Sequence, residues 1–143
     1  MHVSINRVNE YDFEFVKQHI HLFELDNREL HSNEFLVATY NNKIVGFGRI
    51  RNHESCCELC SLGIIEAERL KGIGKRLVSE LIKQSYKPLY LVCIIPTFFE
   101  PFNFSIVNEY PVELTNKLNY CTSELCVPEK YVVMKYNKSS ESF

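Results

Sequence analysis

A short basic segment with two glycines is the part of the sequence whose residue types point most directly to chemistry. From Ser61 to Leu81 the chain reads SLGIIEAERLKGIGKRLVSEL, where an apolar run gives way to charge and then to an amphipathic stretch. The first amides of a helix have no partner within the helix, and the helix dipole is positive there. Gly72 and Gly74 allow a phosphate to approach such amides without meeting a Cβ atom. The segment therefore predicts an anion site between a strand and a helix.

Three phosphate-binding patterns can be compared with this segment. The Walker A loop needs a glycine where the chain has Arg69 and a Ser or Thr where it has Arg76. The dinucleotide fingerprint G-x-G-x-x-G needs its third glycine where the chain has Leu77. The pattern Arg-x-x-Gly-x-Gly, from Arg69 to Gly74, is matched in full. The alternative explanation is a surface turn with charged residues beside a helix.

The apolar periodicity of the flanking segments indicates the elements that must position this loop. Cys57–Ile65 and Leu89–Ile95 predict two apolar, central strands, and Gly72–Gln84 between them predicts an amphipathic helix. This order favours a right-handed crossover with parallel pairing. Asn41-Asn42 predicts a hairpin turn, because asparagine tolerates positive φ. The other expected elements are the strands Val3–Val8, Glu34–Tyr40, Lys43–Arg51, Phe104–Val107 and Tyr131–Tyr136 and the helices Tyr11–Ile20, Phe23–Leu30 and Pro111–Leu118.

Length and composition are typical of one globular domain. The chain has 143 residues, 45% of them apolar, and a formal net charge of −2, which gives no general attraction to nucleic acid. No run of about 18 apolar residues predicts a membrane span. The N-terminal residues lack the apolar core of a signal peptide, so we expect a cytoplasmic protein. We expect residues 1–138 to form a single domain and residues 139–143 a frayed tail.

The six cysteines are expected to be free thiols in that compartment. Cys57-x-x-Cys60 has the spacing of a metal or redox motif. It lies in a predicted strand, however, where residues three apart point to opposite faces and cannot easily share a metal. We therefore expect no metal site.

Taken together, these features resemble the Gcn5-related N-acetyltransferase (GNAT) superfamily. The motif Arg69–Gly74 looks like that family's coenzyme A pyrophosphate loop, and it follows the strand Glu58–Ile64 as in the family. The sequence KIVGFG, Lys43–Gly48, is similar to the strand just upstream. The resemblance implies an α/β, GNAT-like acyl-CoA N-acyltransferase fold, in which a twisted mixed sheet is splayed at its central parallel strands and flanked by helices. It also implies acetyl-CoA as the acetyl donor.

The resemblance further implies which residues hold the cofactor. Leu62, Gly63 and Ile64 would contact the pantetheine arm and the acetyl carbonyl, and the Ile64 amide would stabilise the oxyanion. The amides of residues 70–75 would bind the pyrophosphate, with added charge from Arg69 and Lys71. The implied cofactor-binding residues are Leu62, Gly63, Ile64, Arg69, Leu70, Lys71, Gly72, Ile73, Gly74, Lys75 and Phe99.

Phe98–Phe104 resembles a second family signature, an aromatic pair followed by x-x-x-Gly-Phe. Asn103 replaces the glycine, and asparagine is the next-best residue for positive φ. Phe99 stands where many members carry a tyrosine that protonates the leaving thiolate. Because phenylalanine cannot donate a proton, solvent or another group must do so, or the thiolate leaves unaided.

Glu58 is the candidate general base. It lies eleven residues before Arg69, the spacing at which the histone acetyltransferase branch places its base. On a regular strand it shares a face with Cys60, Leu62 and Ile64, although a bulge would break this parity. The alternative role is that of a salt-bridged strand carboxylate.

The sequence thus predicts an N-acetyltransferase that moves acetyl directly from the thioester to the primary amine of a small molecule. Similarity to the N-acetylglutamate synthase branch, seen in Phe98-Phe99 and Tyr110-Pro111, makes an amino acid a candidate acceptor. Arg28, Arg49 and Arg51 offer guanidinium groups for its carboxylate, or are ordinary surface charges.

Other functions remain open at this point. The acceptor can instead be a peptide or protein amine, or the chain can be a non-catalytic module that binds or senses acyl-CoA, as Phe99 favours. A ping-pong reaction through Cys60 or Cys93 is a further mechanism. A homodimer through Tyr131–Tyr136 is a candidate assembly.

Overall fold

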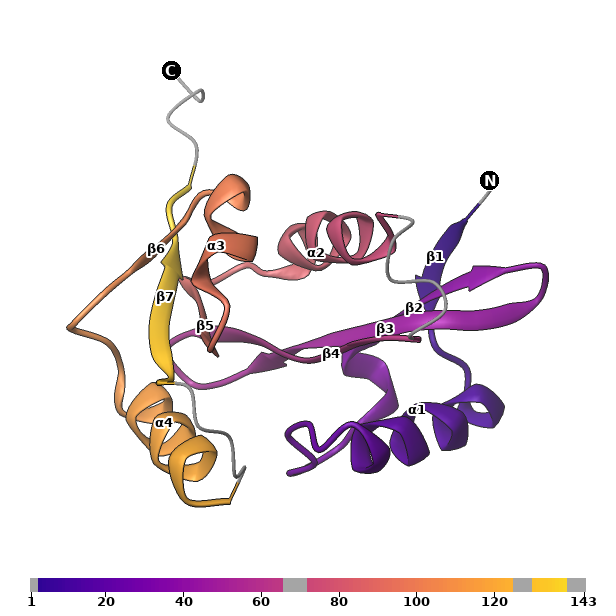
Figure 1. The fold of residues 1–143 in the computed structure, drawn as a ribbon, viewed down its shortest axis with the longest axis horizontal. Coiled ribbons are helices and arrows are strands. Elements are labelled where there is room, and N and C mark those ends of the chain that lie inside the picture. The colour runs from indigo at the N-terminus through magenta and orange to yellow at the C-terminus, as the bar shows by residue number, and fades with distance from the viewer. Residues whose placement is uncertain (1–2, 66–71, 125–129, 139–143) are drawn as a thin grey trace. The chain divides into compact units, whose positions relative to one another are not determined.

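The computed structural model describes residues 3–65, 72–124 and 130–138 (Figure 1). The strands expected from the sequence are confirmed. The elements in chain order are β1 (Ser4–Arg7), α1 (Glu10–Leu22), β2 (Phe35–Tyr40), β3 (Lys43–Asn52), β4 (Cys57–Ile64), α2 (Ile73–Gln84), β5 (Leu89–Cys93), α3 (Pro96–Phe99), β6 (Phe104–Ile106), α4 (Val112–Glu124) and β7 (Val132–Tyr136). The strands form one mixed sheet in the order β1-β2-β3-β4-β5-β7-β6.

The chain forms two compact units. The first contains the described parts of residues 1–51 and 59–85, and the second contains those of residues 52–58 and 86–143. None of the helices in the described ranges is both long and apolar enough to cross a membrane.

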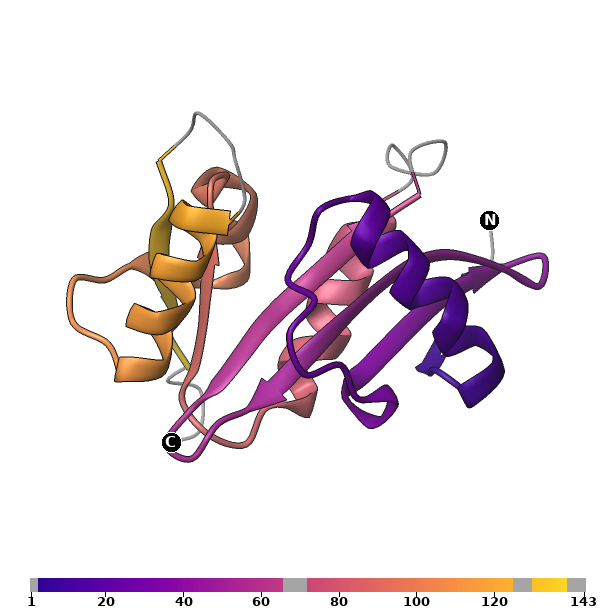
Figure 2. The same ribbon diagram turned by 90° about the horizontal axis from the view of Figure 1, so that it is seen from below.

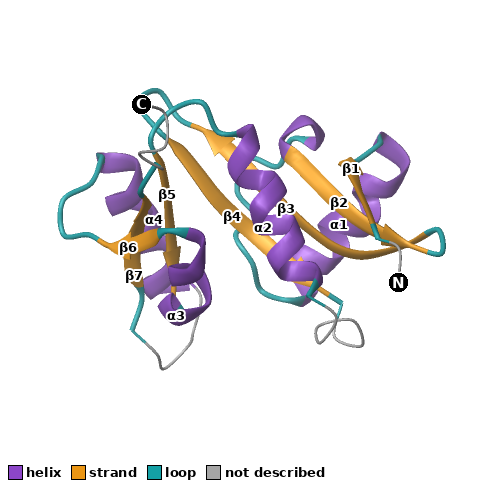
Figure 3. Ribbon diagram, turned by 90° about the horizontal axis from the view of Figure 1, so that it is seen from above, coloured by secondary structure: helices purple, strands orange, loops and turns teal. Residues whose placement is uncertain are grey.

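In the first unit, α1 covers one face of the strands β1–β4 and α2 covers the other (Figures 1 and 3). The face under α1 is packed with apolar side chains spaced three and four residues apart on the helix, Phe13, Val16 and Ile20. The buried face of α2 has the same periodicity, so both helices are held by amphipathic packing. The core residues under α1 are Val8, Phe13, Val16, Ile20, Phe35, Val37 and Phe47.

Local signals explain how these elements begin and turn. Asn9 caps α1, because its side chain accepts a hydrogen bond of 2.7 Å from the Asp12 amide. Asn41 and Asn42 have φ of 52° and 62°, which confirms the predicted turn between β2 and β3.

The helix predicted over Phe23–Leu30 is wrong. This segment is a loop in which Glu24 and Glu29 have positive φ, at 56° and 48°. A helix would direct the backbone carbonyls to its own amides. Here the carbonyls of Arg28 and Glu29 accept hydrogen bonds from the buried Arg49 instead, so a tertiary contact overrides the local preference.

In the second unit, β5, β7 and β6 pair antiparallel, and α4 packs on β5 and β7 (Figure 2). The buried residues between them are Cys56, Tyr90, Leu114 and Val133. β5 also pairs with the start of β4 in parallel, through Cys57↔Leu89 and Glu58↔Tyr90, which confirms the predicted parallel pairing. Asn103 has φ of 73°, as its place in the aromatic signature predicts.

Candidate active site

A bulge in β4 decides which side chains share a face. Ser61 has φ of 53°, and its Oγ lies 3.9 Å from Sγ of the preceding Cys60, so two consecutive residues face the same side. Leu62 and Ile64 point to the opposite side, which α2 covers. There the side chain of Leu62 lies against Gly48 of β3, and that of Ile64 lies against Gly46. The prediction that Glu58, Cys60, Leu62 and Ile64 share one face is therefore wrong, because the bulge reverses the parity after Cys60.

Gly63 is required by close packing. A Cβ atom at this position would lie 2.5 Å from Cζ of Phe47 and 3.1 Å from Cδ2 of Phe23. These two rings are stacked, with centroids 6.3 Å apart and planes 11° apart. The backbone of the predicted acetyl-binding stretch thus rests directly on the loop that follows α1.

Gly72 is the N-cap of α2 and has φ of 73°, a conformation that favours glycine. Among the residues that the structure describes, and apart from its chain neighbours, no atom lies within 4 Å of a Cβ built there. Ile73 is buried in the core, whereas Gly72 and Lys75 are exposed. Arg76 binds the carbonyl of Val3 at 2.8 Å, which ties the start of α2 to the chain before β1. The predicted pyrophosphate residues Arg69, Leu70 and Lys71 lie outside the described residues.

Phe99 is part of an aromatic cluster in the second unit. It is buried and meets Phe98 edge-on at 4.9 Å and Phe104 at 5.9 Å between ring centroids. At this position the chain therefore offers packing and no proton donor.

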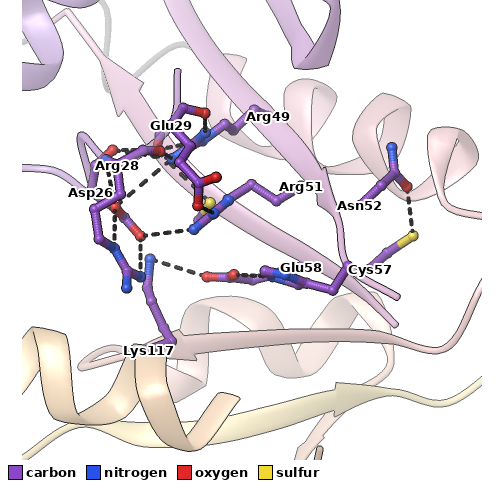
Figure 4. Close-up of polar contacts among 12 residues, drawn as sticks. Asp26, Arg28, Glu29, Arg49, Arg51, Asn52, Cys57, Glu58 and Lys117 are labelled. Carbon is purple, nitrogen blue, oxygen red and sulfur yellow. Dashed lines mark hydrogen bonds and ion pairs between the residues drawn. The ribbon is translucent and has the colours of Figure 1, made fainter. Parts of the chain in front are cut away.

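Glu58 is fully buried between the side chains of His53 and Lys117 (Figure 4). Its Oε1 lies 2.8 Å from Nε2 of His53, and its Oε2 lies 3.1 Å from Nζ of Lys117 on α4. Lys87 donates to the backbone carbonyl of His53. The carboxylate is thus salt-bridged as the alternative role requires, and it remains an acceptor with further lone pairs.

His53 and Lys117 were missed in the sequence. Lys117 had a signal, because it lies on the apolar side of α4, three residues after the buried Leu114. A lysine on such a face needs a buried anion. His53 had none, since its contact depends on the path of the loop between β3 and β4.

Arg49 organises the loop between α1 and β2. It has no exposed surface and makes five hydrogen bonds within the described chain, the number of N–H groups that a guanidinium has. Its acceptors are the Ser61 hydroxyl at 3.0 Å, the Glu34 carboxylate at 3.1 Å and the backbone carbonyls of Asp26, Arg28 and Glu29. Burial alone lowers the pKa of Arg49, but Cys60, Asp26 and Glu34 raise it, so the net pKa is above its ordinary value. With its donors used internally, Arg49 is poorly suited to bind a substrate carboxylate.

The five cysteines of the described residues, Cys56, Cys57, Cys60, Cys93 and Cys121, form no disulfide with one another. Burial raises the pKa of Cys93 to about 11, and burial with nearby carboxylates raises that of Cys56 to about 11. A thiol protonated at neutral pH is a poor nucleophile. Cys93 is therefore a weak candidate for a ping-pong reaction.

Solved structures of other proteins share this fold. N-acetylglutamate synthase from Neisseria gonorrhoeae, solved with coenzyme A and N-acetyl-glutamate, matches with a TM-score of 0.76 and 15% identity, over 96% of this chain and 36% of its own. Rv2747 from Mycobacterium tuberculosis, solved with CoA and NLQ, matches with a TM-score of 0.75 and 16% identity, over 95% and 99%. Naa50 from Arabidopsis thaliana, solved with the bisubstrate analogue CoA-Ac-MVNAL, matches with a TM-score of 0.67 and 17% identity, over 96% and 100%. The chain thus spans little more than a third of the gonococcal synthase.

These likenesses confirm the predicted GNAT-like acyl-CoA N-acyltransferase fold. No curated protein matches the chain in sequence. The family model described as acetyltransferase (GNAT) family matches residues 5–96, which is more than half of the chain. The chain therefore belongs to the acetyltransferase (GNAT) family, a family of N-acetyltransferases whose acetyl donor is acetyl-CoA.

Proposed function

We propose that residues 1–138 act as one domain that transfers acetyl directly from acetyl-CoA to the primary amine of a small molecule, with an amino acid as the first candidate. The observation that carries this proposal is the family match over β1 to β5, together with the left-handed cap at Gly72, which lies within the segment that resembles the family's pyrophosphate loop. The predicted fold gives the cofactor a strand to lie along and a helix start for its phosphates.

The proposed cofactor contacts follow the sequence prediction. The pantetheine arm lies along Leu62–Ile64, and the amide of Ile64 stabilises the oxyanion. The pyrophosphate lies on the amides of residues 70–75, with Arg69 and Lys71 supplying positive charge. Because Leu62 and Ile64 direct their side chains towards α2, it is their backbone groups that serve the arm.

Glu58 is the proposed base. The amine attacks the thioester carbonyl, a tetrahedral oxyanion forms, and the C–S bond breaks to release the coenzyme A thiolate. The proton lost by the amine passes to the Glu58 carboxylate directly or through water. Lys117 at 3.1 Å favours the ionised carboxylate that can accept it. Since the buried Phe99 cannot donate, the thiolate takes its proton from solvent.

Two measurements test the proposal. Acetyl-CoA is expected to raise the melting temperature of the protein, because a ligand of the native state stabilises it. A panel of primary amines is then assayed for release of the coenzyme A thiol. A melting temperature unchanged by saturating acetyl-CoA would contradict the proposal.

The buried Phe99 favours a second candidate, a non-catalytic module that binds or senses acyl-CoA. Acetyl-CoA binding without thiol release from any amine would support that candidate. The panel also includes a short peptide with a free N-terminus, because the Naa50 structure with its CoA-Ac-MVNAL analogue makes a peptide acceptor the alternative to an amino acid. The cytoplasmic location and the homodimer remain predictions.

A further inference from the structure

One ion pair of the first unit joins a nearly buried cation to an exposed anion (Figure 4). Nη2 of Arg51 donates to Oε2 of Glu29 at 2.9 Å, and Nη1 lies 3.9 Å from Oδ2 of Asp26. The Arg51 side chain is 11% exposed, whereas that of Glu29 is 75% exposed. The arginine is therefore fixed by its surroundings, while the glutamate can swing into solvent.

The backbone around Glu29 does not depend on this ion pair. The carbonyl of Glu29 is held by Nη1 of Arg49 at 3.1 Å, and that of Arg28 by Nη2 at 3.0 Å. Glu29 also keeps a positive φ of 48°, an uncommon conformation for a residue with a side chain. The loop thus stays in place when the Glu29 carboxylate leaves Arg51.

Hydrogen bonds connect this loop to the predicted acetyl-binding stretch. Ser61, the residue before Leu62, accepts from Arg49 at 3.0 Å and donates to the carbonyl of Asp26 at 2.8 Å. Arg51 lies two residues after Arg49 on β3, so both side chains leave the same face of the strand. Arg51 therefore belongs to the polar cluster that adjoins the stretch where acetyl is proposed to lie.

The charges of this cluster are balanced while Glu29 is in place. Arg28, Arg49 and Arg51 face Asp26, Glu29 and Glu34. Asp26 is already bound by both Nε and Nη2 of Arg28, at 3.0 and 2.9 Å. Departure of the Glu29 carboxylate leaves one nearly buried guanidinium in need of an anion.

We propose that Arg51 binds the carboxylate of the acceptor, and that Glu29 occupies this place until the acceptor displaces it. A planar guanidinium is well suited to a carboxylate. The acceptor is then an amine that also carries a carboxylate, an amino acid. This inference rests on the proposed function, since it identifies the acceptor of that reaction.

The test uses binding, so that it does not require turnover. L-amino acids and their α-carboxamides are titrated calorimetrically into the full chain saturated with coenzyme A. We expect wild type to bind at least one acid about tenfold more tightly than its amide, as for a charge-assisted hydrogen bond. Arg51→Gln is expected to weaken binding of that acid by about tenfold or more and to leave the amide nearly unchanged. In the comparison of variants, each compound is compared with itself, which cancels the differing basicity of the amines.

Glu29→Gln provides a second test of the site. The substitution is not expected to destabilise the fold, because the Glu29 side chain is exposed. Removing the competing carboxylate is expected to tighten binding of the acid by about threefold and not that of the amide. Arg51→Lys keeps the charge and loses the planar fork, so an intermediate loss is expected. Lys17→Gln, at a half-exposed site on α1, is the matched control and is expected to change neither.

Acid and amide that bind wild type equally, or that are weakened equally by Arg51→Gln, would overturn the inference. The thiol-release assay separates this result from a failure of the proposed function. Turnover that treats acid and amide alike leaves the acetyltransferase proposal standing and overturns the carboxylate site. Arg51-dependent binding of acids without any turnover supports the carboxylate site and overturns the enzymatic proposal.

Discussion

Two fully buried charges of this protein, Arg49 in the first unit and Glu58 in the second, are satisfied in different ways. Arg49 donates hydrogen bonds to backbone carbonyls of one loop and to the side chains of Ser61 and Glu34. Glu58 is held by the side chains of His53 and Lys117. A charge that binds main chain shapes the fold, because its partners cannot move without the loop. A charge that binds side chains can exchange a proton or a partner while the backbone stays in place.

The largest effect expected from this difference is the loss of Arg49. Arg49→Met leaves three carbonyls and the buried Asp26 with fewer partners, so the free energy of unfolding should fall by about 4 kcal/mol or more. Urea denaturation measures this change, and Lys17→Met, at a half-exposed site on α1, is the control. A loss below about 1 kcal/mol would show that the loop does not depend on the arginine.

Lys117→Met is expected to have the next largest effect on stability. It removes the cation at 3.1 Å from a buried carboxylate, which should cost about 3 kcal/mol of unfolding free energy. Adding Glu58→Gln to the same chain should recover part of this loss, since no unpaired charge then remains. Arg49→Met should show no such recovery with Glu34→Gln, because most partners of Arg49 are carbonyls. Equal behaviour of the two double variants would remove the distinction between main-chain and side-chain partners.

Glu58→Gln alone should act on the reaction more than on the fold. Glutamine keeps the shape of the side chain, so the protein should remain folded with its coenzyme A affinity intact. Turnover of the amine should fall by about a hundredfold, as for the loss of a general base. Steady-state kinetics with thiol detection measures this, and calorimetry with coenzyme A is the control. Unchanged turnover in Glu58→Gln would show that Glu58, like Arg49, has a structural role and is not the general base.

The same difference explains what could be predicted from the sequence. The strands, α1, α2 and the turns at Asn42 and Asn103 follow from local periodicity and backbone preference, and these predictions are confirmed. The helix over Phe23–Leu30 failed because the carbonyls of that loop bind an arginine more than fifteen residues away. The prediction that Leu62 and Ile64 share a face with Glu58 was wrong because Ser61 adopts a positive φ, and no glycine at this position indicates it. The partners of Glu58 depend on tertiary packing. Of the two, only Lys117 could have been found from the sequence, because a lysine on the apolar side of a helix indicates a buried anion.

The smallest effect is expected at Cys93, a buried titratable group that carries no charge at neutral pH. Burial raises its pKa to about 11, so the folded state holds the proton more tightly than the unfolded state does. This contribution to stability is complete below the ordinary thiol pKa and is lost as the pH rises from there towards about 11. Cys93→Ala should therefore flatten the alkaline fall of the melting temperature and change turnover at neutral pH by no more than about twofold. A large loss of turnover in Cys93→Ala would contradict this expectation. It would show that the buried Cys93 thiol takes part in the reaction although it has no charged partner among the described residues.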